Sequence, residues 1–170
     1  LQTPVARLFG SLFAALALAA LVTGCGSRSR ELQPGSYRAV LELPGGELPA
    51  GADPDDYVIH QQDVQAVVNA LWAGGAEAMM LQDQRVISTS AVRCVGNTLI
   101  LQGRVYSPPY VITAIGDTGA MRDALDDDPQ VENLRQWSVA VGLGYDSALV
   151  GEQTFPAFVG SIVPQHAEVP

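Results

Sequence analysis

The alternation of hydrophobic and polar positions predicts a series of short strands. Tyr37, Ala39, Leu41 and Leu43 fall on one face of the segment 37–43, which indicates a strand with one buried face. Clusters of Gly, Asn, Asp and Gln separate this and later apolar runs and are typical of turns. We therefore predict strands over residues 37–43, 76–81, 86–92, 98–101, 110–115 and 145–150.

The clearest predicted helix is amphipathic, because apolar residues recur at positions i, i+3, i+4, i+7 and i+8. The stripe consists of Val64, Val67, Val68, Leu71 and Trp72. Asp63 lies in the first turn, where its charge suits the positive end of the helix dipole. Gly74 and Gly75 predict a C-terminal stop in the left-handed conformation.

Two further helices are predicted from their capping residues. Asp117 or Thr118 can cap a short helix. Asp128 and Pro129 are typical of the cap and the first position of another helix, which ends at Gly142. The tail that follows the last strand is predicted to be extended and interrupted by proline.

The element order is strand, helix, several strands, two short helices and a strand. This order predicts an α+β fold, with a mainly antiparallel sheet carrying its helices on one face. We expect a ferredoxin-like (split βαβ) core with an extra hairpin. The expected organisation is a targeting segment over residues 1–25, a linker over 26–35, a single domain over 36–163 and a tail over 164–170.

The N-terminal segment predicts export. Arg7 precedes the apolar run Leu8–Val22, as the charged region precedes the apolar region of a secretory signal. The run leads into Cys25 through Val-Thr-Gly, a pattern similar to a bacterial lipobox, in which the Cys is lipidated. Two alternatives remain: an uncleaved membrane anchor, or a chance match. Either anchored form places the domain at the extracytoplasmic face of the cell membrane.

Charge and composition narrow the function classes. The chain carries 18 acidic and 9 basic residues, a formal charge of −9, which argues against nucleic acid as a partner. The cysteines are Cys25 and Cys94 and the histidines are His60 and His166, without the spacing of a metal site. No cofactor motif is recognisable. The sequence therefore predicts neither a metal nor a cofactor.

Three ordered motifs resemble a known family. The first comprises residues 60–63 and 69–78, the second residues 85–98, and the third residues 106–110 with 115–117. The chain resembles the family numbered 881 among domains of unknown function, which is common in actinobacteria and other Gram-positive bacteria.

The resemblance extends over residues 34–160 and implies little about activity. Family members are membrane-anchored, and some are labelled division initiation proteins. The resemblance implies no established activity and no catalytic residue. Members usually place a coiled-coil-like stretch between anchor and domain, whereas here only six residues separate Cys25 from Leu32. The oligomeric state is therefore left open.

Three candidates for chemistry each have a structural alternative. Cys94 could act as a nucleophile with His60 as its base, but a free cysteine on a strand is more often a small buried hydrophobe. A histidine at position 60 is more often a packed or capping residue than an acid–base catalyst. The run Asp126–Asp128 suggests calcium, but consecutive Asp before Pro is better explained by helix capping.

A binding surface is the remaining candidate. The start of the first helix, the end of a strand and a proline-stiffened aromatic segment are predicted to lie close together. Arg93 would be its charged anchor, unless it pairs with Asp63 or Glu77 instead. The predicted surface comprises His60, Gln61, Gln62, Asp63, Arg93, Asn97, Tyr106, Ser107 and Tyr110.

These features predict a non-catalytic binding or scaffold domain at the cell envelope, linked to division or wall assembly. Its expected partners are the membrane, through the N-terminal anchor, and an envelope protein or wall component. The alternatives are an envelope hydrolase acting on wall material, which needs convergent carboxylates or a nucleophile–base pair, and a small-ligand sensor, by analogy of fold.

Overall fold

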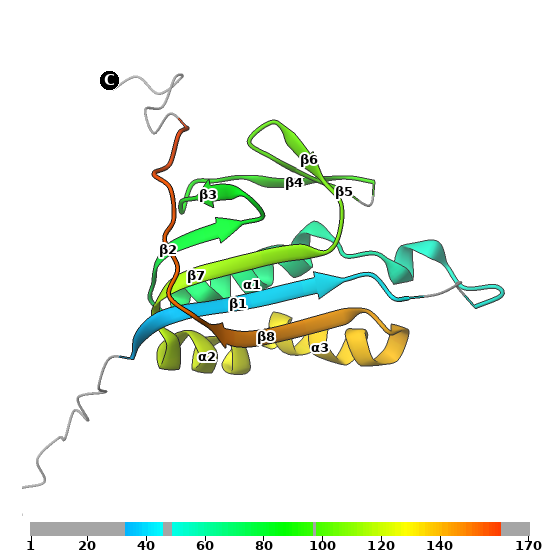
Figure 1. Cartoon of the computed structure of the whole chain (residues 1–170). Coiled ribbons are helices and arrows are strands. Elements are labelled where there is room, and N and C mark those ends of the chain that lie inside the picture. The colour runs from blue at the N-terminus through cyan, green and yellow to red at the C-terminus, as the bar shows by residue number, and fades with distance from the viewer. Residues whose placement is uncertain (1–32, 46–48, 97, 161–170) are drawn as a thin grey trace, which may run out of the picture. The chain divides into compact units, whose positions relative to one another are not determined.

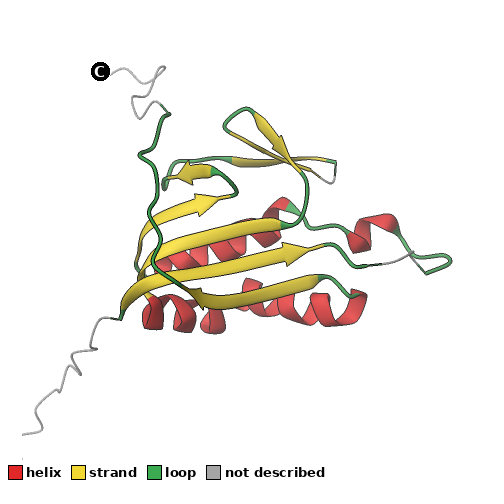
Figure 2. Cartoon of the chain, viewed as in Figure 1, coloured by secondary structure: helices red, strands yellow, loops and turns green. Residues whose placement is uncertain are grey.

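The computed structural model describes residues 33–45, 49–96 and 98–160. Within these ranges the chain forms two antiparallel sheets, three α-helices and one short 3₁₀ helix (Figure 2). The elements are β1 (Pro34–Glu42), η1 (Pro54–Tyr57), α1 (Gln61–Ala73), β2 (Ala76–Leu81), β3 (Gln84–Val86), β4 (Val92–Val95), β5 (Thr98–Leu101), β6 (Arg104–Tyr106), β7 (Tyr110–Asp117), α2 (Thr118–Asp127), α3 (Pro129–Val141) and β8 (Gly144–Val150).

The larger sheet has the strand order β3-β2-β7-β1-β8. All of its neighbouring strands are antiparallel, so β1 runs parallel to β2 with β7 between them. The predicted α+β class with a mainly antiparallel sheet is therefore confirmed. The strand order is also compatible with the predicted split βαβ core, in which β2, β7, β1 and β8 would be the four core strands.

The three α-helices lie on one face of this sheet (Figure 1). Alternate residues of β1 point toward them, and Ala39 and Leu41 are fully buried. The facing residues of β7, Ile112 and Tyr110, are fully buried as well. On α1, Leu71 is fully buried, as predicted, but Trp72 is only partly buried at the margin of the core. The core therefore lies between the sheet and the helix layer.

The helix ends follow their capping residues. Asp117 accepts hydrogen bonds from the amides of Gly119 and Ala120 in the first turn of α2. Asp128 likewise caps α3, which begins with Pro129. Gly142 ends α3 in the left-handed conformation, as predicted. At the end of α1, Gly75 has a φ of 84°, whereas Gly74 has a φ of −75°. Of the two glycines predicted to end α1, only Gly75 therefore adopts the left-handed conformation.

Gly74 instead allows a close approach between helices. A Cβ atom at this position would lie 2.6 Å from the Cα of Met121 and 2.9 Å from the carbonyl oxygen of Ala120. Both atoms belong to the backbone of α2, which a side-chain rotation cannot move. The end of α1 therefore packs directly on the first turns of α2.

The predicted strand over residues 86–92 is wrong. Its first residue ends β3, and β4 begins only at Val92. Ser90 closes a turn between them, because its backbone amide donates to Ile87 and its hydroxyl accepts from the Ile87 amide. Hydroxyl side chains offer the backbone such local partners in place of a ladder. The chain then forms a separate sheet with the order β4-β5-β6, in which the third strand was not predicted.

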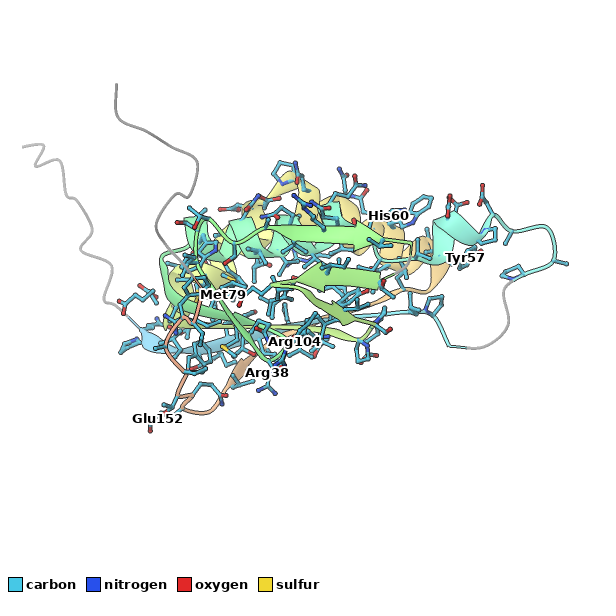
Figure 3. The ribbon with its side chains drawn as sticks, turned by 90° about the horizontal axis from the view of Figure 1, so that it is seen from above. Arg38, Tyr57, His60, Met79, Arg104 and Glu152 are labelled. Carbon is cyan, nitrogen blue, oxygen red and sulfur yellow. The ribbon has the colours of Figure 1, made fainter. Side chains whose placement is uncertain are left out.

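The segment after β8 is extended, as predicted, and crosses the large sheet on the face opposite the helices (Figure 1). The guanidinium of Arg85 on β3 lies 5.7 Å from the ring centre of Phe155 in this segment. Arg38, on the same sheet face, donates a 3.4 Å hydrogen bond to Thr113. In Figure 3, Arg38 lies on the side of the sheet away from the helices. Both faces of the sheet are thus covered, at least in part.

Several predictions fall outside the described residues: the targeting segment 1–25 with its lipidation site Cys25, most of the linker 26–35, the tail 164–170 and the predicted surface residue Asn97. The proposed domain limits also stay a prediction. Among the helices that the structure describes, none is long and apolar enough to cross a bilayer.

Candidate functional site

A hollow lies between η1, the first turns of α1, and α3. This α1–α3 cleft has a volume of about 730 Å³. Its walls are mainly polar, and they come from segments some 70 residues apart in the chain. It is lined by Asp55, Asp56, His60, Gln62, Asp63, Ala66, Gln130, Asn133, Leu134, Gln136, Trp137 and Ala140.

Trp137 joins two walls of the cleft. Its indole nitrogen donates a 3.2 Å hydrogen bond to the backbone carbonyl of Asp56 in η1. The residue is nevertheless 47% exposed, because the buried stripe of α3 runs through Val131, Leu134 and Ser138 instead. The hydrogen bond fixes the orientation of the ring and leaves part of its surface open to a ligand. A rigid aromatic side chain in a cleft binds ligands at little cost in conformational entropy.

The first turn of α1 contributes another part of the lining. His60 occupies the N-cap position, and its backbone amide donates a 2.8 Å hydrogen bond to the carboxylate of Asp63. Asp63 is thereby held in place, as the residue at the third position of a capping box is. His60 lies near η1, close to Tyr57 in Figure 3, and its imidazole Nδ1 is 3.8 Å from the Asp63 carboxylate.

The charge of the cleft is negative. Asp55, Asp56 and Asp63 supply three carboxylates, and the cleft lining contains neither arginine nor lysine. Burial raises the pKa of Asp63, although the amide hydrogen bond from His60 and the nearby imidazole lower it in part. Burial disfavours the ionised form of a carboxyl group, whereas a nearby positive charge or hydrogen-bond donor stabilises that form. A ligand with either feature would therefore stabilise ionised Asp63.

The residues of the predicted binding surface lie in separate parts of the structure. His60, Gln62 and Asp63 line the α1–α3 cleft. Gln61 points instead toward β4, where its side-chain oxygen accepts a 3.3 Å hydrogen bond from the amide of Cys94. Arg93, the neighbour of Cys94, is exposed, and the ion pairs among the described residues do not join it to Asp63 or Glu77.

The aromatic segment takes part in a different cluster. The hydroxyl of Tyr106 donates to Asp83 in the turn between β2 and β3, and Arg104 pairs with the same carboxylate at 2.9 Å. The Tyr106 hydrogen bond is the largest cause that lowers the pKa of Asp83. Tyr110 is fully buried, and Ser107 is exposed. Tyr106 and Tyr110 therefore join the small sheet to the large one and do not line the cleft.

Cys94 lies where a nucleophile would be poorly activated. Its thiol is partly buried against the core, and burial raises the pKa of the thiol. The charge of Asp63 raises this pKa further. Burial is also the largest cause that raises the pKa of Tyr110 to about 12, with a contribution from Cys94. A high thiol pKa leaves little thiolate at neutral pH, and the thiolate is the reactive form.

The run Asp126–Asp128 has structural roles. Asp128 caps α3, and its carboxylate accepts from the amides of Gln130 and Val131 at 2.8 and 3.1 Å. Asp126 pairs with Arg135 at 2.8 Å. Within the described ranges, no three side chains of the metal-binding types are grouped as metal ligands.

The cleft residues that sequence reasoning missed include Asp55, Asp56, Gln130, Asn133 and Trp137. One signal was available. Trp137 falls outside the buried stripe of its own helix, and tryptophan is enriched at binding surfaces. The other four are polar residues in polar segments. Only the packing of η1 and α3 beside α1 distinguishes them.

Comparison with known proteins identifies relatives but no activity. The family model DUF881, described as bacterial protein of unknown function, matches residues 39–168. A UPF0749 protein of Mycobacterium tuberculosis is 33% identical over 87 residues, covering 51% of this chain and 28% of that protein. The UPF0749 protein YlxW of Bacillus subtilis is 29% identical over 79 residues, covering 46% of this chain and 34% of that protein. The aligned part thus spans about a third of these relatives or less.

A solved structure shows the same fold. The crystal structure of an uncharacterized conserved protein from Mycobacterium tuberculosis superimposes with a TM-score of 0.56 and 23% sequence identity. The superposition covers 82% of this chain and 90% of the other. At this level of identity, the similarity establishes the fold alone.

Proposed function

Because the chain belongs to the DUF881 family, whose function is unknown, we propose its function from its surface: it is a non-catalytic binding domain whose ligand occupies the α1–α3 cleft. The observation that carries this proposal is the cleft itself. Its volume of about 730 Å³ suits a small molecule or a short peptide segment. One wall holds a fixed, half-exposed indole, and the others present carboxylates and carboxamides.

The chemistry of the reactive groups supports binding in preference to catalysis. Cys94 has a raised thiol pKa, and its neighbours are Gln61, Asp63 and Tyr110. The carboxylate of Asp63 caps α1 through the His60 amide. A raised carboxyl pKa is also a property of general acids in hydrolases, so hydrolysis of an envelope polymer is the alternative that the test must distinguish.

We further propose that the domain works at the extracytoplasmic face of the membrane. The support is the sequence of the N-terminal segment, with the apolar run Leu8–Val22 and the lipobox-like Cys25. In this location the ligand would be an envelope protein or a wall component, and the binding would serve division or wall assembly.

The test uses Trp137 as a reporter. The chain has two tryptophans, so a Trp72→Phe background leaves Trp137 as the sole indole. The full chain in a non-ionic detergent is titrated with fractionated envelope extract, and any ligand is then recovered and weighed by mass spectrometry. Asn133→Phe obstructs the cleft, whereas Val139→Phe adds the same ring at an 89% exposed position of the same helix.

A binding domain gives a saturable change in Trp137 emission that Asn133→Phe abolishes and Val139→Phe preserves. The recovered ligand has an unchanged mass. A ligand whose mass changes during incubation would replace this proposal with the hydrolase. A signal that is insensitive to Asn133→Phe, or no signal in any fraction, would place the function elsewhere on the molecule.

A further inference from the structure

We infer that the α1–α3 cleft binds a positively charged group, an ammonium or a guanidinium, that lies against the face of Trp137. This inference rests on the proposed function, because it names the chemistry of the ligand for the same cleft. Three independent features support it: the sign of the charge, the fixed indole and the carbonyl oxygens of the carboxamides.

The charge of the lining favours a cation. Asp55 and Asp56 are exposed on η1, and Asp63 lines the cleft from α1. The ion pairs among the described residues occupy neither Asp55 nor Asp56, so both carboxylates are available to a ligand. Asp63 is half-buried, and burial raises its pKa. A bound cation would offset the cost of keeping this carboxylate ionised.

The indole of Trp137 supplies a surface that suits a cation. Its N–H group is already used in the hydrogen bond to the Asp56 carbonyl. The ring therefore offers a ligand mainly its π-face, whose negative potential attracts ammonium and guanidinium groups more strongly from tryptophan than from other aromatic residues. The same hydrogen bond holds the indole beside η1, which carries Asp55 and Asp56.

The carboxamides complete the set of acceptors. Gln62 from α1 and Gln130 and Asn133 from α3 line the cleft. Their side-chain oxygens can accept hydrogen bonds from the N–H groups of a cation. Carboxamides and an indole would also suit a neutral sugar, but a neutral sugar would leave three carboxylates without a counter-charge. The negative lining therefore decides between the two ligand classes.

The charged group can come from a free amine or from Lys or Arg in a partner protein. The probes are putrescine, the N-acetylated and C-amidated peptide Gly-Arg-Gly-Arg-Gly, its neutral counterpart Gly-Gln-Gly-Gln-Gly with the same capped ends, and the neutral disaccharide chitobiose in its N,N′-diacetylated form. Each is titrated into the full-length Trp72→Phe chain, with Trp137 emission as the readout. Asp56→Asn removes one carboxylate of the cleft and keeps the backbone carbonyl that binds Trp137. Asp146→Asn, at an exposed position of β8, is the matched control.

We expect saturable binding of the arginine peptide and no binding of the glutamine peptide. Asp56→Asn should weaken binding about fivefold, as expected for one contact between unit charges in water, and Asp146→Asn less than twofold. Added salt should weaken binding. If putrescine binds as well, a free amine is sufficient; if only the peptide binds, the source is a partner segment, and both results support the inference.

The inference is overturned if neither cation binds, or if Asp56→Asn and Asp146→Asn have equal effects. Binding of chitobiose without the cations would leave the cleft as the binding site and would refute only its charge preference. If all four probes fail, the inference fails, and the extract titration decides separately whether the cleft binds anything.

Discussion

Replacing Gly74 with alanine tests the contact between α1 and α2. The new Cβ would lie 2.6 Å from the Met121 Cα, which is too close for two carbon atoms, so the helices must separate. Overpacking of this kind costs about 1–3 kcal/mol. Gly74 already has a φ of −75°, which alanine adopts without strain. Alanine also lowers the conformational entropy of the unfolded chain, which stabilises the folded protein by about 0.4–1 kcal/mol and offsets part of this cost.

From the midpoints of these two ranges, the net expectation for Gly74→Ala is a loss of about 1 kcal/mol in the free energy of unfolding. For a domain of this size, the midpoint of thermal unfolding should fall by about 3–5 °C per kcal/mol. Urea and thermal unfolding followed by far-ultraviolet circular dichroism measure both quantities. Gly45→Ala is the control, because a Cβ there meets no atom within 4 Å. Equal stability of the two variants would refute the assignment of a tight helix contact.

Two further predictions concern the core and the first turn of α1. Leu71 is fully buried, so Leu71→Ala should cost about 2–5 kcal/mol in urea unfolding. Val139→Ala, at an exposed position, is the control and should change the free energy of unfolding by less than about 0.5 kcal/mol. An equally small effect of Leu71→Ala would mean that α1 does not pack on the sheet. Burial raises the pKa of Asp63 above 3.8, so the folded protein holds more protons than the unfolded chain between the two pKa values. The unfolding free energy of the wild type relative to Asp63→Asn should therefore fall as pH rises through this window, and a constant difference across pH would contradict the pKa shift.

Local signals in the sequence located most elements. Asp117, Asp128 and Gly142 each act through atoms within a few residues along the chain, so their caps were predictable. The limits of β2 and β5 matched the prediction, because turn residues enclose both strands. The strand predicted over residues 86–92 failed because Ser90 satisfies the Ile87 backbone locally. β6 was missed because it has three residues, of which Arg104 and Val105 are exposed and show no alternation.

The candidate site was predictable only in part. His60, Gln62 and Asp63 were chosen as polar residues at a helix start, and they do line the cleft. Their partners on η1 and α3 depend on how α3 packs beside α1, which no local pattern specifies. The predicted surface placed Tyr106 beside the start of α1, which assumed that the two segments lie close together in the fold. Tyr106 instead turns to Asp83, and the sequence does not show that β6 brings them together.

The position of β1 in the large sheet has a mechanical consequence. β1 is the first strand among the described residues, yet it lies inside the sheet and pairs with β7 from Pro34 to Leu41 and with β8 from Ser36 to Glu42. A pull on the chain at Pro34, directed along the strand, would load both ladders in shear. Many hydrogen bonds then resist together, whereas a strand at the sheet edge can be peeled away pair by pair. A domain held by the chain that precedes β1 would thus carry tension through its longest described ladders.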